Sequence, residues 1–294
     1  MIASDVTLGF GGQAIRFEMR QPGARLVVRS PHTNFILPSD ADARCVVRCE
    51  FGQPVPGDAP IRFDAGSIWD IRTSVSGGDE VCFHTATAAG GREPFAILTL
   101  DDDLRGGRLV RTPSPSDDGG MTVGFPLDEY LAARLLARSG GLVLHASCLL
   151  EDGEALLFMG HSGAGKSTMA ELAEGRGADV LSDDRTILTV RKDGRVVAWG
   201  TPWHGSYTRG SARSAPVAAI FLLVQDARDA IVPLPGARAF GELLVRLVRP
   251  TVDRRELELT IGTAERVAAS VRCAELRFRP TPAAYDMARS YARA

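Results

Sequence analysis

A glycine-rich segment between an apolar run and a helical run constrains this chain more than any other feature. Residues 160–167 read GHSGAGKS and match the phosphate-binding pattern G-x-x-x-x-G-K-[ST]. The apolar run 155–159 before it predicts a strand, and residues 168–173 after it predict a helix. Strand, glycine loop and helix in this order form the setting in which the pattern binds nucleotide phosphates. We therefore expect a nucleotide site here rather than an ordinary glycine-rich turn.

In a surface loop of this type, both backbone N–H groups and side chains bind the phosphate. Glycines permit backbone conformations in which successive N–H groups point at an anion, and the helix that follows adds N–H donors and the positive end of its dipole. Lys166 supplies a cation for the outer phosphates, and the Ser167 hydroxyl can bind Mg²⁺. Lys166 and Lys192 are the only lysines in the chain, so few residues were available for a chance match. The predicted nucleotide-binding residues are Gly160, His161, Ser162, Gly163, Ala164, Gly165, Lys166, Ser167 and Thr168.

Composition and charge exclude several classes of protein. The 294 residues are 45% hydrophobic and 24% charged, with a formal net charge of -2, as in ordinary globular proteins. Without a basic excess we expect no nucleic-acid partner, and without a signal segment or a long apolar run we expect a cytoplasmic protein with no membrane contact. The five cysteines are scattered, and we expect reduced thiols rather than a metal site at Cys45 and Cys49.

Residues 1–124 predict a β-rich N-terminal domain. Short alternating runs separated by Gly, Pro and Asp clusters favour an antiparallel sandwich or an open barrel. We expect the histidines at 32 and 84 to be lone surface or packing residues, and we find no catalytic constellation in this half. The stretch 111–120, rich in Pro, Ser and Gly, predicts a linker or mobile loop. The predicted strands are 14–19, 25–29, 44–51, 61–63, 68–71, 81–83 and 95–100.

Residues 125–294 predict an α/β domain built around the glycine loop. One buried strand is expected over 142–150, forming a hairpin with 155–159, and a second hairpin joins 186–190 to 196–199. A Gly/Pro/aromatic loop at 200–205 precedes a continuous buried strand at 217–224. The remaining predicted elements are helices at 127–138, 237–248, 253–270 and 282–292 and strands at 178–184 and 275–279.

Two adjacent carboxylates end the strand predicted at 178–184. Nucleotide sites of α/β sheets lie at the carboxyl ends of strands, so Asp183 and Asp184 should share one sheet edge with the glycine loop. A phosphoryl-transfer site needs an acid for Mg²⁺ and a group that positions or deprotonates the acceptor, and two aspartates can divide those tasks. The alternative is that the pair caps the hairpin that follows.

The pattern resembles the catalytic domain of HPr kinase/phosphorylase, a P-loop module related in shape to phosphoenolpyruvate carboxykinase. The resemblance covers roughly 140–210 and rests on His145, the glycine loop, Arg176-Gly177 and the run LSDDR at 181–185. It implies an α/β P-loop kinase domain in which Asp183 is the acid/base for the acceptor serine, with His145 beside it, and in which Ser167 and Asp184 help to hold Mg²⁺. Taken alone, His145 on a buried strand would be interpreted as a core histidine; together with the glycine loop and the aspartate pair it is interpreted as a site residue.

The chain departs from that family in three places. The family's N-terminal domain is α/β, whereas residues 1–124 predict a β-rich domain. Thr168-Met169 stands where the family commonly has a glutamate, and residues 200–205 replace its signature loop. This arrangement is similar to that of HPr-kinase-related proteins found with ribosomal-peptide biosynthesis genes, some of which phosphorylate a peptide serine.

The expected function is that of an Mg²⁺- and ATP-dependent kinase that transfers the γ-phosphoryl group to a hydroxyl. The acceptor implied by the resemblance is a serine of a peptide or small protein, and a small-molecule hydroxyl is the alternative. A non-catalytic ATP-binding regulatory module is the competing class. Reversal by phosphate and assembly into a homo-oligomer stay open. Trp203-His204 could either pack the domain seam or belong to the site. A second group could either form a solvated helical face or contribute an arginine that contacts phosphate, namely Arg246, Arg249, Arg254 and Arg255.

Overall fold

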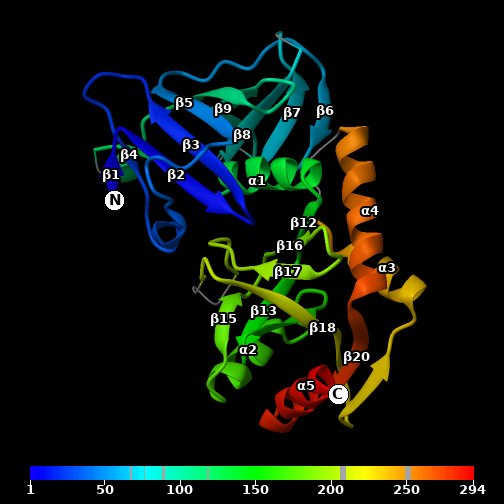
Figure 1. The fold of residues 1–294 in the computed structure, drawn as a ribbon. Helices are drawn as coiled ribbons and strands as arrows, with labels where there is room; N and C mark the ends of the chain where they lie inside the picture. The colour runs from blue at the N-terminus through cyan, green and yellow to red at the C-terminus, as the bar shows by residue number, and fades with distance from the viewer. Residues whose placement is uncertain (67, 76, 88–89, 118, 206–209, 249–252) are drawn as a thin grey trace. The chain divides into compact units, whose positions relative to one another are not determined.

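The chain folds into a mixed α/β structure with several sheets. The computed structural model describes residues 1–66, 68–75, 77–87, 90–117, 119–205, 210–248 and 253–294 (Figure 1). By its internal contacts the chain divides into two compact units, unit 1 (Met1–Asp128) and unit 2 (Glu129–Ala294). The sequence predicts a boundary between residues 124 and 125.

Strands dominate unit 1, as the alternating sequence runs predict. An eight-stranded sheet has the order β2-β3-β5-β10-β9-β8-β7-β6, and a three-stranded sheet has the order β1-β4-β11. The strands of the larger sheet are β2 (Asp5–Phe10), β3 (Gln13–Met19), β5 (Cys45–Phe51), β6 (Ile61–Asp64), β7 (Trp69–Thr73), β8 (Asp79–Ala86), β9 (Arg92–Leu100) and β10 (Gly106–Arg111). The smaller elements are β1 (Ile2–Ala3), β4 (Leu26–Val27), β11 (Met121–Thr122) and the 3-10 helices η1 (His32–Phe35) and η2 (Pro115–Asp117).

The antiparallel pairing expected for unit 1, as a sandwich or an open barrel, does not extend to β5. This strand runs parallel to both of its neighbours, β3 and β10. A tight hairpin cannot join parallel strands, and the chain between β3 and β5 makes a long connection through β4 and η1. Cys45, Val47 and Cys49 point from β5 into the core, while Arg48 between them is exposed. The two cysteines are thus packing residues, and burial raises the pKa of each thiol to about 12.

The stretch 111–120, expected to be a linker or mobile loop, contains hydrogen-bonded structure within unit 1, and its residue 118 lies outside the described residues. Asp117 is only 5% exposed and holds the turn together. Its carboxylate accepts a hydrogen bond from Nη2 of Arg111 at 2.7 Å and one from the backbone N–H of Ser114 at 2.6 Å. The segment has a composition typical of linkers, but one buried carboxylate with satisfied hydrogen bonds gives it a defined structure.

The two histidines of unit 1, expected to be lone surface or packing residues, each lie close to a carboxylate. Nε2 of His84 lies 2.7 Å from Oδ2 of Asp70, and both side chains are buried. Nε2 of His32 lies 2.9 Å from Oδ2 of Asp128. Asp70 lies on β7, the strand that pairs with the β8 strand of His84, whereas Asp128 comes from a distant part of the sequence.

Unit 2 is a mixed nine-stranded sheet with helices on both faces. The strand order is β12-β16-β17-β18-β14-β13-β15, with β20 beside β18 and β19 beside β20. The strands are β12 (Gly141–Leu144), β13 (Ala146–Glu151), β14 (Glu154–Met159), β15 (Asp179–Ser182), β16 (Thr186–Val190), β17 (Val196–Trp199), β18 (Ser214–Gln225), β19 (Ala230–Pro233) and β20 (Arg272–Phe278). The helices are α2 (Lys166–Glu174), α3 (Gly236–Val245), α4 (Arg254–Ser270) and α5 (Pro282–Arg293), and α1 (Leu127–Arg138) crosses from unit 1 into unit 2.

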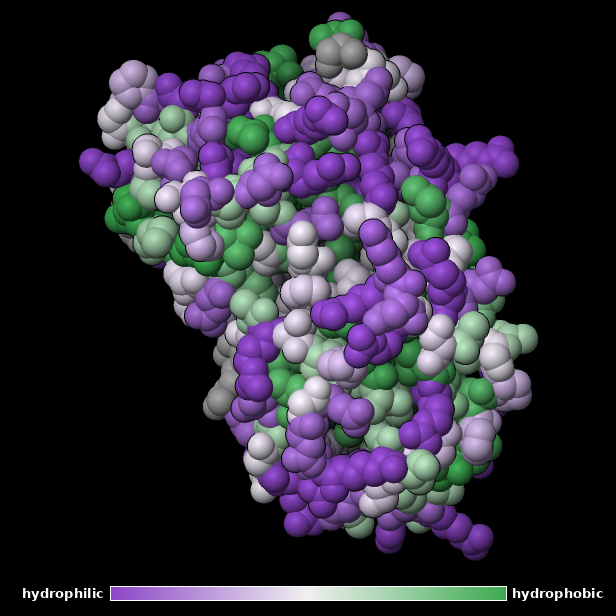
Figure 2. Space-filling model, viewed as in Figure 1, coloured by the Kyte–Doolittle hydropathy of each residue, from purple (hydrophilic) through white to green (hydrophobic). Residues whose placement is uncertain are grey.

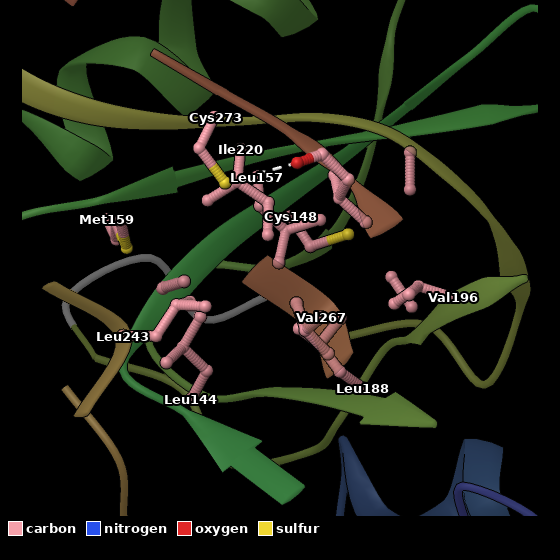
Figure 3. Packing of buried hydrophobic residues seen from close by; sticks show 14 of the residues in the cluster. Leu144, Cys148, Leu157, Met159, Leu188, Val196, Ile220, Leu243, Val267 and Cys273 are labelled. Atoms are coloured by element: carbon pink, nitrogen blue, oxygen red, sulfur yellow. Dashed lines mark hydrogen bonds between the residues drawn. The ribbon is translucent and has the colours of Figure 1, made fainter. Parts of the chain in front are cut away.

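Strand periodicity divides the core of unit 2 into two layers. On β14, Leu157 and Met159 belong to a buried cluster that also contains residues of α3 and α4, such as Leu243 and Val267 (Figure 3). Phe158, which lies between them, belongs to a second cluster with residues of α2 and α5. Because successive side chains of a strand point to opposite faces, one continuous apolar strand serves both layers.

The strand expected over 142–150 is interrupted at His145. Residues before the break form β12, which pairs with β16, and residues after it form β13, which pairs with β14 and β15. The backbone N–H of His145 instead donates to the carbonyl of Arg246 at 2.8 Å. Both predicted hairpins are confirmed, and so are the predicted helices, within three residues at each end. Because of this break, the backbone N–H of His145 does not take part in strand pairing.

The surface of the molecule carries hydrophilic side chains with scattered hydrophobic ones, as Figure 2 shows for one face. Among the residues that the structure describes, no helix combines the length and the apolar character needed to cross a membrane.

Candidate functional site

The glycine loop (residues 160–165) joins β14 to α2 as the sequence predicts. Two of its glycines cannot be replaced without a shift of the structure. A Cβ on Gly160 would come within 2.5 Å of the Cβ of Ala164, and one on Gly165 within 2.7 Å of Cζ of Phe278. Gly165 also has a φ of 105°, in the left-handed region that residues with a Cβ rarely adopt. The tight loop delivers the N-terminus of α2, with its N–H groups and dipole, to one edge of the sheet.

Lys166 is the first residue of α2, and its side chain is buried rather than exposed at the loop surface. Its Nζ donates hydrogen bonds to the carbonyls of Gly160 at 3.1 Å and His161 at 3.3 Å. Burial lowers the pKa of the ammonium group, while the negative charge of Asp184 acts in the opposite direction. Nε2 of Gln225, the last residue of β18, donates to the carbonyl of Gly163 at 3.0 Å and braces the loop.

Sheet direction brings the aspartate pair to the same edge as the glycine loop. β13 runs antiparallel to both β14 and β15, so β14 and β15 point the same way and their carboxyl ends lie together. β15 ends at Ser182, and the two aspartates follow in a bend. Strict alternation of side chains therefore no longer applies to Asp183 and Asp184, and both can face the loop.

The two aspartates have different surroundings. Asp183 is 3% exposed, and its carboxylate accepts a hydrogen bond from the backbone N–H of Gly205, at 3.0 Å to Oδ1 and 3.2 Å to Oδ2. A Cβ on Gly205 would lie 3.3 Å from Oδ2 of Asp183, so the glycine permits this close approach. Oδ1 of Asp184 instead lies 3.1 Å from Nδ1 of His145, and its Oδ2 accepts a short hydrogen bond from Nη1 of Arg185.

The environment of Asp184 favours its ionised form. Burial alone would raise the pKa of this carboxyl group, but the hydrogen bond from His145 and the positive charges of Arg185, His145 and Lys166 hold it below its ordinary value of 3.8. Nε of Arg185 also donates to Oε1 of Glu129 at 3.2 Å. The arginine is thus shared between two carboxylates.

One cavity of about 510 Å³ gathers most of the residues predicted for the site. The predicted catalytic and metal-binding residues lie around it, as does much of the glycine loop, whereas Gly160, His161 and Ala164 do not line it. His161 is exposed, with Nδ1 2.7 Å from the carbonyl oxygen of Ser162. The lining residues are His145, Ser162, Gly163, Gly165, Lys166, Ser167, Thr168, Asp183, Asp184, Gly205 and Gln225.

Three residues at the site have no role predicted from the sequence, namely Gly205, Gln225 and Arg185. Gln225 ends a buried strand parallel to β14, so its place at the carboxyl edge could have been inferred from strand direction. The bond from Gly205 to Asp183 left no signal in the sequence. Arg246 pairs with Glu242 at 2.6 Å, and exposed Arg254 pairs with Glu258 at 2.8 Å. Trp203 is buried, His204 is exposed, and Arg249 lies outside the described residues.

Ser167 and Asp184 are suited to hold Mg²⁺ together with a nucleotide. Among the described residues no three His, Cys, Asp or Glu side chains form a metal-binding cluster. Nucleotide-bound Mg²⁺ does not require one, because it keeps several waters and takes one or two carboxylates in addition to phosphate oxygens. A hydroxyl and an ionised carboxylate facing one cavity fit that description.

Comparisons with known proteins find partial similarities. Residues 129–246, less than half of the chain, match the family model described as SynChlorMet cassette protein ScmC. No curated protein sequence matches the chain. Among solved structures, the Hpr(Ser) kinase/phosphatase from Coxiella burnetii is similar at 12% sequence identity and a TM-score of 0.30, over 51% of this chain and 93% of that chain. This likeness is too loose to assign a function to the chain.

Proposed function

We propose that unit 2 is an Mg²⁺-dependent phosphotransferase of the P-loop kinase type, which moves the γ-phosphoryl group of ATP to a hydroxyl. The observation that carries this proposal is the shared cavity. Lys166, Ser167 and Thr168 at the N-terminus of α2 line it together with Asp183, Asp184 and His145. A phosphoryl-transfer site needs cationic and N–H donors for the phosphates, an acid for the metal and a group for the acceptor.

Each residue takes one task in this reaction. The backbone N–H groups of the glycine loop and the ammonium group of Lys166 hold the β- and γ-phosphates. Ser167 and Asp184 hold Mg²⁺, which when bound neutralises charge that develops on the phosphate oxygens. Asp183 takes the proton of the acceptor hydroxyl while the acceptor oxygen bonds to the γ-phosphorus and ADP leaves. The N–H of Gly205 keeps the Asp183 carboxylate in place for that step.

We favour a serine of a peptide or small protein as the acceptor. The matched family model describes a cassette protein, and a cassette is a set of genes that lie together, so the products of neighbouring genes are the first acceptors to test. A small molecule with a hydroxyl group is the alternative acceptor.

A non-catalytic ATP-binding module is the competing class. Binding alone requires the glycine loop, Lys166 and a metal ligand. It does not require a second, nearly buried carboxylate such as Asp183, or His145 facing the same cavity. The presence of both therefore favours catalysis over sensing.

Transfer of label from γ-labelled ATP distinguishes these functions. The full chain is incubated with Mg²⁺, labelled ATP and, separately, peptides encoded by neighbouring genes or small hydroxyl compounds. We expect label on one acceptor with the native chain and none with Asp183→Asn. Asp193→Asn is the matched control, because Asp193 lies in the exposed turn between β16 and β17. Tight ATP binding without transfer to any acceptor would favour the regulatory module instead.

A further inference from the structure

Arg185 joins three other segments of unit 2 to the bend that follows β15. Its Nε donates to Oε1 of Glu129, near the start of α1, at 3.2 Å. Its Nη1 lies 2.6 Å from Nδ1 of His145, at the break between β12 and β13, and also donates to Oδ2 of Asp184. Its carbonyl oxygen accepts a hydrogen bond from the hydroxyl of the buried Thr201, which follows β17. One residue thus ties together segments that are far apart in the sequence.

The guanidinium group of Arg185 holds His145 and Asp184 close together. Oδ1 of Asp184 lies 3.1 Å from Nδ1 of His145. When Nδ1 accepts a hydrogen bond from Arg185, it cannot also donate to Asp184, so two acceptors face each other. Nη1 of Arg185 carries two N–H groups and can donate to both acceptors, which makes their approach favourable. A lysine ammonium lacks the planar fork that reaches both acceptors while Nε stays on Glu129.

The head group of Arg185 lies behind residues that face the proposed nucleotide site. His145 and Asp184 are among the described lining residues of the cavity of about 510 Å³, whereas Arg185 is not. In this arrangement the guanidinium group acts on the cavity through the two side chains that it orients. The geometry is therefore that of a positioning residue and not of a group that touches the nucleotide.

The backbone of Arg185 is tied to the loop that supports the second aspartate. The hydroxyl of Thr201 donates to the carbonyl of Arg185, and further along the same loop the N–H of Gly205 donates to the carboxylate of Asp183. The loop is thus fastened to the aspartate bend at two points. The residue that contacts the proposed metal ligand is also an anchor of the loop that holds the proposed base.

From these contacts we infer that Arg185 positions the metal-binding carboxylate, by fixing the orientation in which Asp184 meets Mg²⁺ and the nucleotide. This role rests on the proposed function, in which Asp184 holds Mg²⁺. Mg²⁺ demands near-octahedral geometry, so a carboxylate that can rotate binds it less well. Loss of a group that hydrogen-bonds a metal ligand costs about 10- to 100-fold in metal affinity or activity. The positive charge of Arg185 acts in the opposite direction, because it repels Mg²⁺.

Titration calorimetry of the full chain with ADP, once with Mg²⁺ and once with EDTA, tests this role. Arg185→Lys keeps the charge and loses the fork. We expect it to lower the affinity for ADP in Mg²⁺ about tenfold, and to leave the affinity for ADP in EDTA within about twofold of the native value. Arg191→Lys is the matched control, because Arg191 lies exposed between β16 and β17. Equal losses in Mg²⁺ and in EDTA, or no loss in Mg²⁺, would contradict the role.

Arg185→Gln separates positioning from competition. If the guanidinium group only competed with Mg²⁺ for Asp184, its removal would strengthen the Mg²⁺-dependent binding of ADP. If Arg185 positions the carboxylate, its removal should weaken that binding, although a repelling charge is lost at the same time. Tighter binding of ADP in Mg²⁺ by Arg185→Gln would therefore overturn the role.

A double-mutant cycle tests whether Arg185 acts through Asp184. In the Asp184→Asn background, Arg185→Lys should cause little further loss of Mg²⁺-dependent affinity, because the carboxylate that it orients is gone. Additive losses would mean that Arg185 acts on the nucleotide directly and would overturn the role. Asp184→Asn alone separates this role from the proposed function. If Asp184→Asn binds ADP in Mg²⁺ like the native chain, the metal assignment fails and the role of Arg185 with it. If Asp184→Asn weakens binding and Arg185→Lys does not, only the role of Arg185 fails.

Discussion

Nδ1 of His145 lies 3.1 Å from Oδ1 of Asp184, although one residue interrupts the ladder between β12 and β13 and the other follows β15. Nη1 of Arg185 lies 2.6 Å from the same ring nitrogen. A single ring nitrogen cannot donate to a carboxylate and accept from a guanidinium group at once. The protonation and tautomer of His145 therefore decide how Asp184 is held, and Arg185 and His145 together occupy the carboxylate proposed to bind Mg²⁺.

The first prediction concerns Asp184. Asp184→Asn removes the charge that attracts Mg²⁺ but keeps the shape of the side chain. We expect weaker Mg²⁺-dependent binding of ATP, measured by titration calorimetry at several Mg²⁺ concentrations, and partial recovery of activity at high Mg²⁺. Asp193→Asn should behave like the native chain. Identical Mg²⁺ dependence in Asp184→Asn and the native chain would remove this residue from the metal site.

Replacement of Lys166 should weaken nucleotide binding and abolish nucleotide-dependent activity without unfolding the protein. Because Lys166 is buried and bonded to two loop carbonyls, Lys166→Met is a better test than alanine, since it keeps the length of the apolar stem. We expect ATP affinity to fall about 10- to 100-fold, as for loss of a charged hydrogen bond, and the Tm to fall by about 2–4 °C. Lys192→Met at the other, exposed lysine is the control. Near-normal turnover of Lys166→Met would exclude a phosphate-binding loop.

The acid stability of unit 2 should depend on Glu151. Burial by itself would raise the pKa of this carboxyl group, but hydrogen bonds from Tyr285 and Arg289 and the charges of Arg289 and Arg293 lower it below its ordinary value of 4.5. A carboxyl group with a lowered pKa in the folded state stabilises the protein above its ordinary pKa, and that contribution is lost as the pH falls below it. Native stability should therefore decline below about pH 4.5.

Thermal unfolding of Glu151→Gln between pH 7 and pH 3 checks this prediction. The variant should be less stable than the native chain at pH 7, and the difference should shrink as the pH falls. Glu154→Gln is the control, because Glu154 lies exposed directly across the hairpin from Glu151. A constant difference between Glu151→Gln and the native chain at every pH would show that the charge of Glu151 contributes nothing.

The parts of the fold with local signals were predictable from the sequence. The glycine loop, α1 and the hairpin from β13 to β14 each depend on residues close together in the chain, such as Asp152 and Gly153, which take positive φ in the turn. The meeting of Asp183 and Asp184 with the loop also followed from a general rule, that functional groups collect at the carboxyl ends of strands.

Features set by distant partners were not predictable. The partners of Asp117 are near in the sequence, Arg111 and the N–H of Ser114, but the Pro/Ser/Gly composition of the segment does not indicate that they bury its carboxylate. The break at His145 depends on a backbone bond to Arg246, far along the chain. The same holds for the contact of Gly205 with Asp183, because neither residue type nor spacing indicates which backbone N–H will reach a carboxylate.

The last prediction separates the two aspartates by kind of effect. If Asp183 is the base for the acceptor, Asp183→Asn should lower turnover about 10²- to 10⁴-fold, the usual contribution of a positioned general base. ATP affinity should stay within a few-fold of the native value, because the metal ligand Asp184 is intact. The asparagine can keep its oxygen toward the N–H of Gly205, so the bend after β15 should hold and the Tm should change little. Single-turnover transfer from labelled ATP measures the rate, and titration calorimetry measures the affinity. If Asp183→Asn instead weakens Mg²⁺-ATP binding and leaves the transfer rate of the bound complex unchanged, Asp183 acts on the metal and the base must be sought at His145, which lines the same cavity.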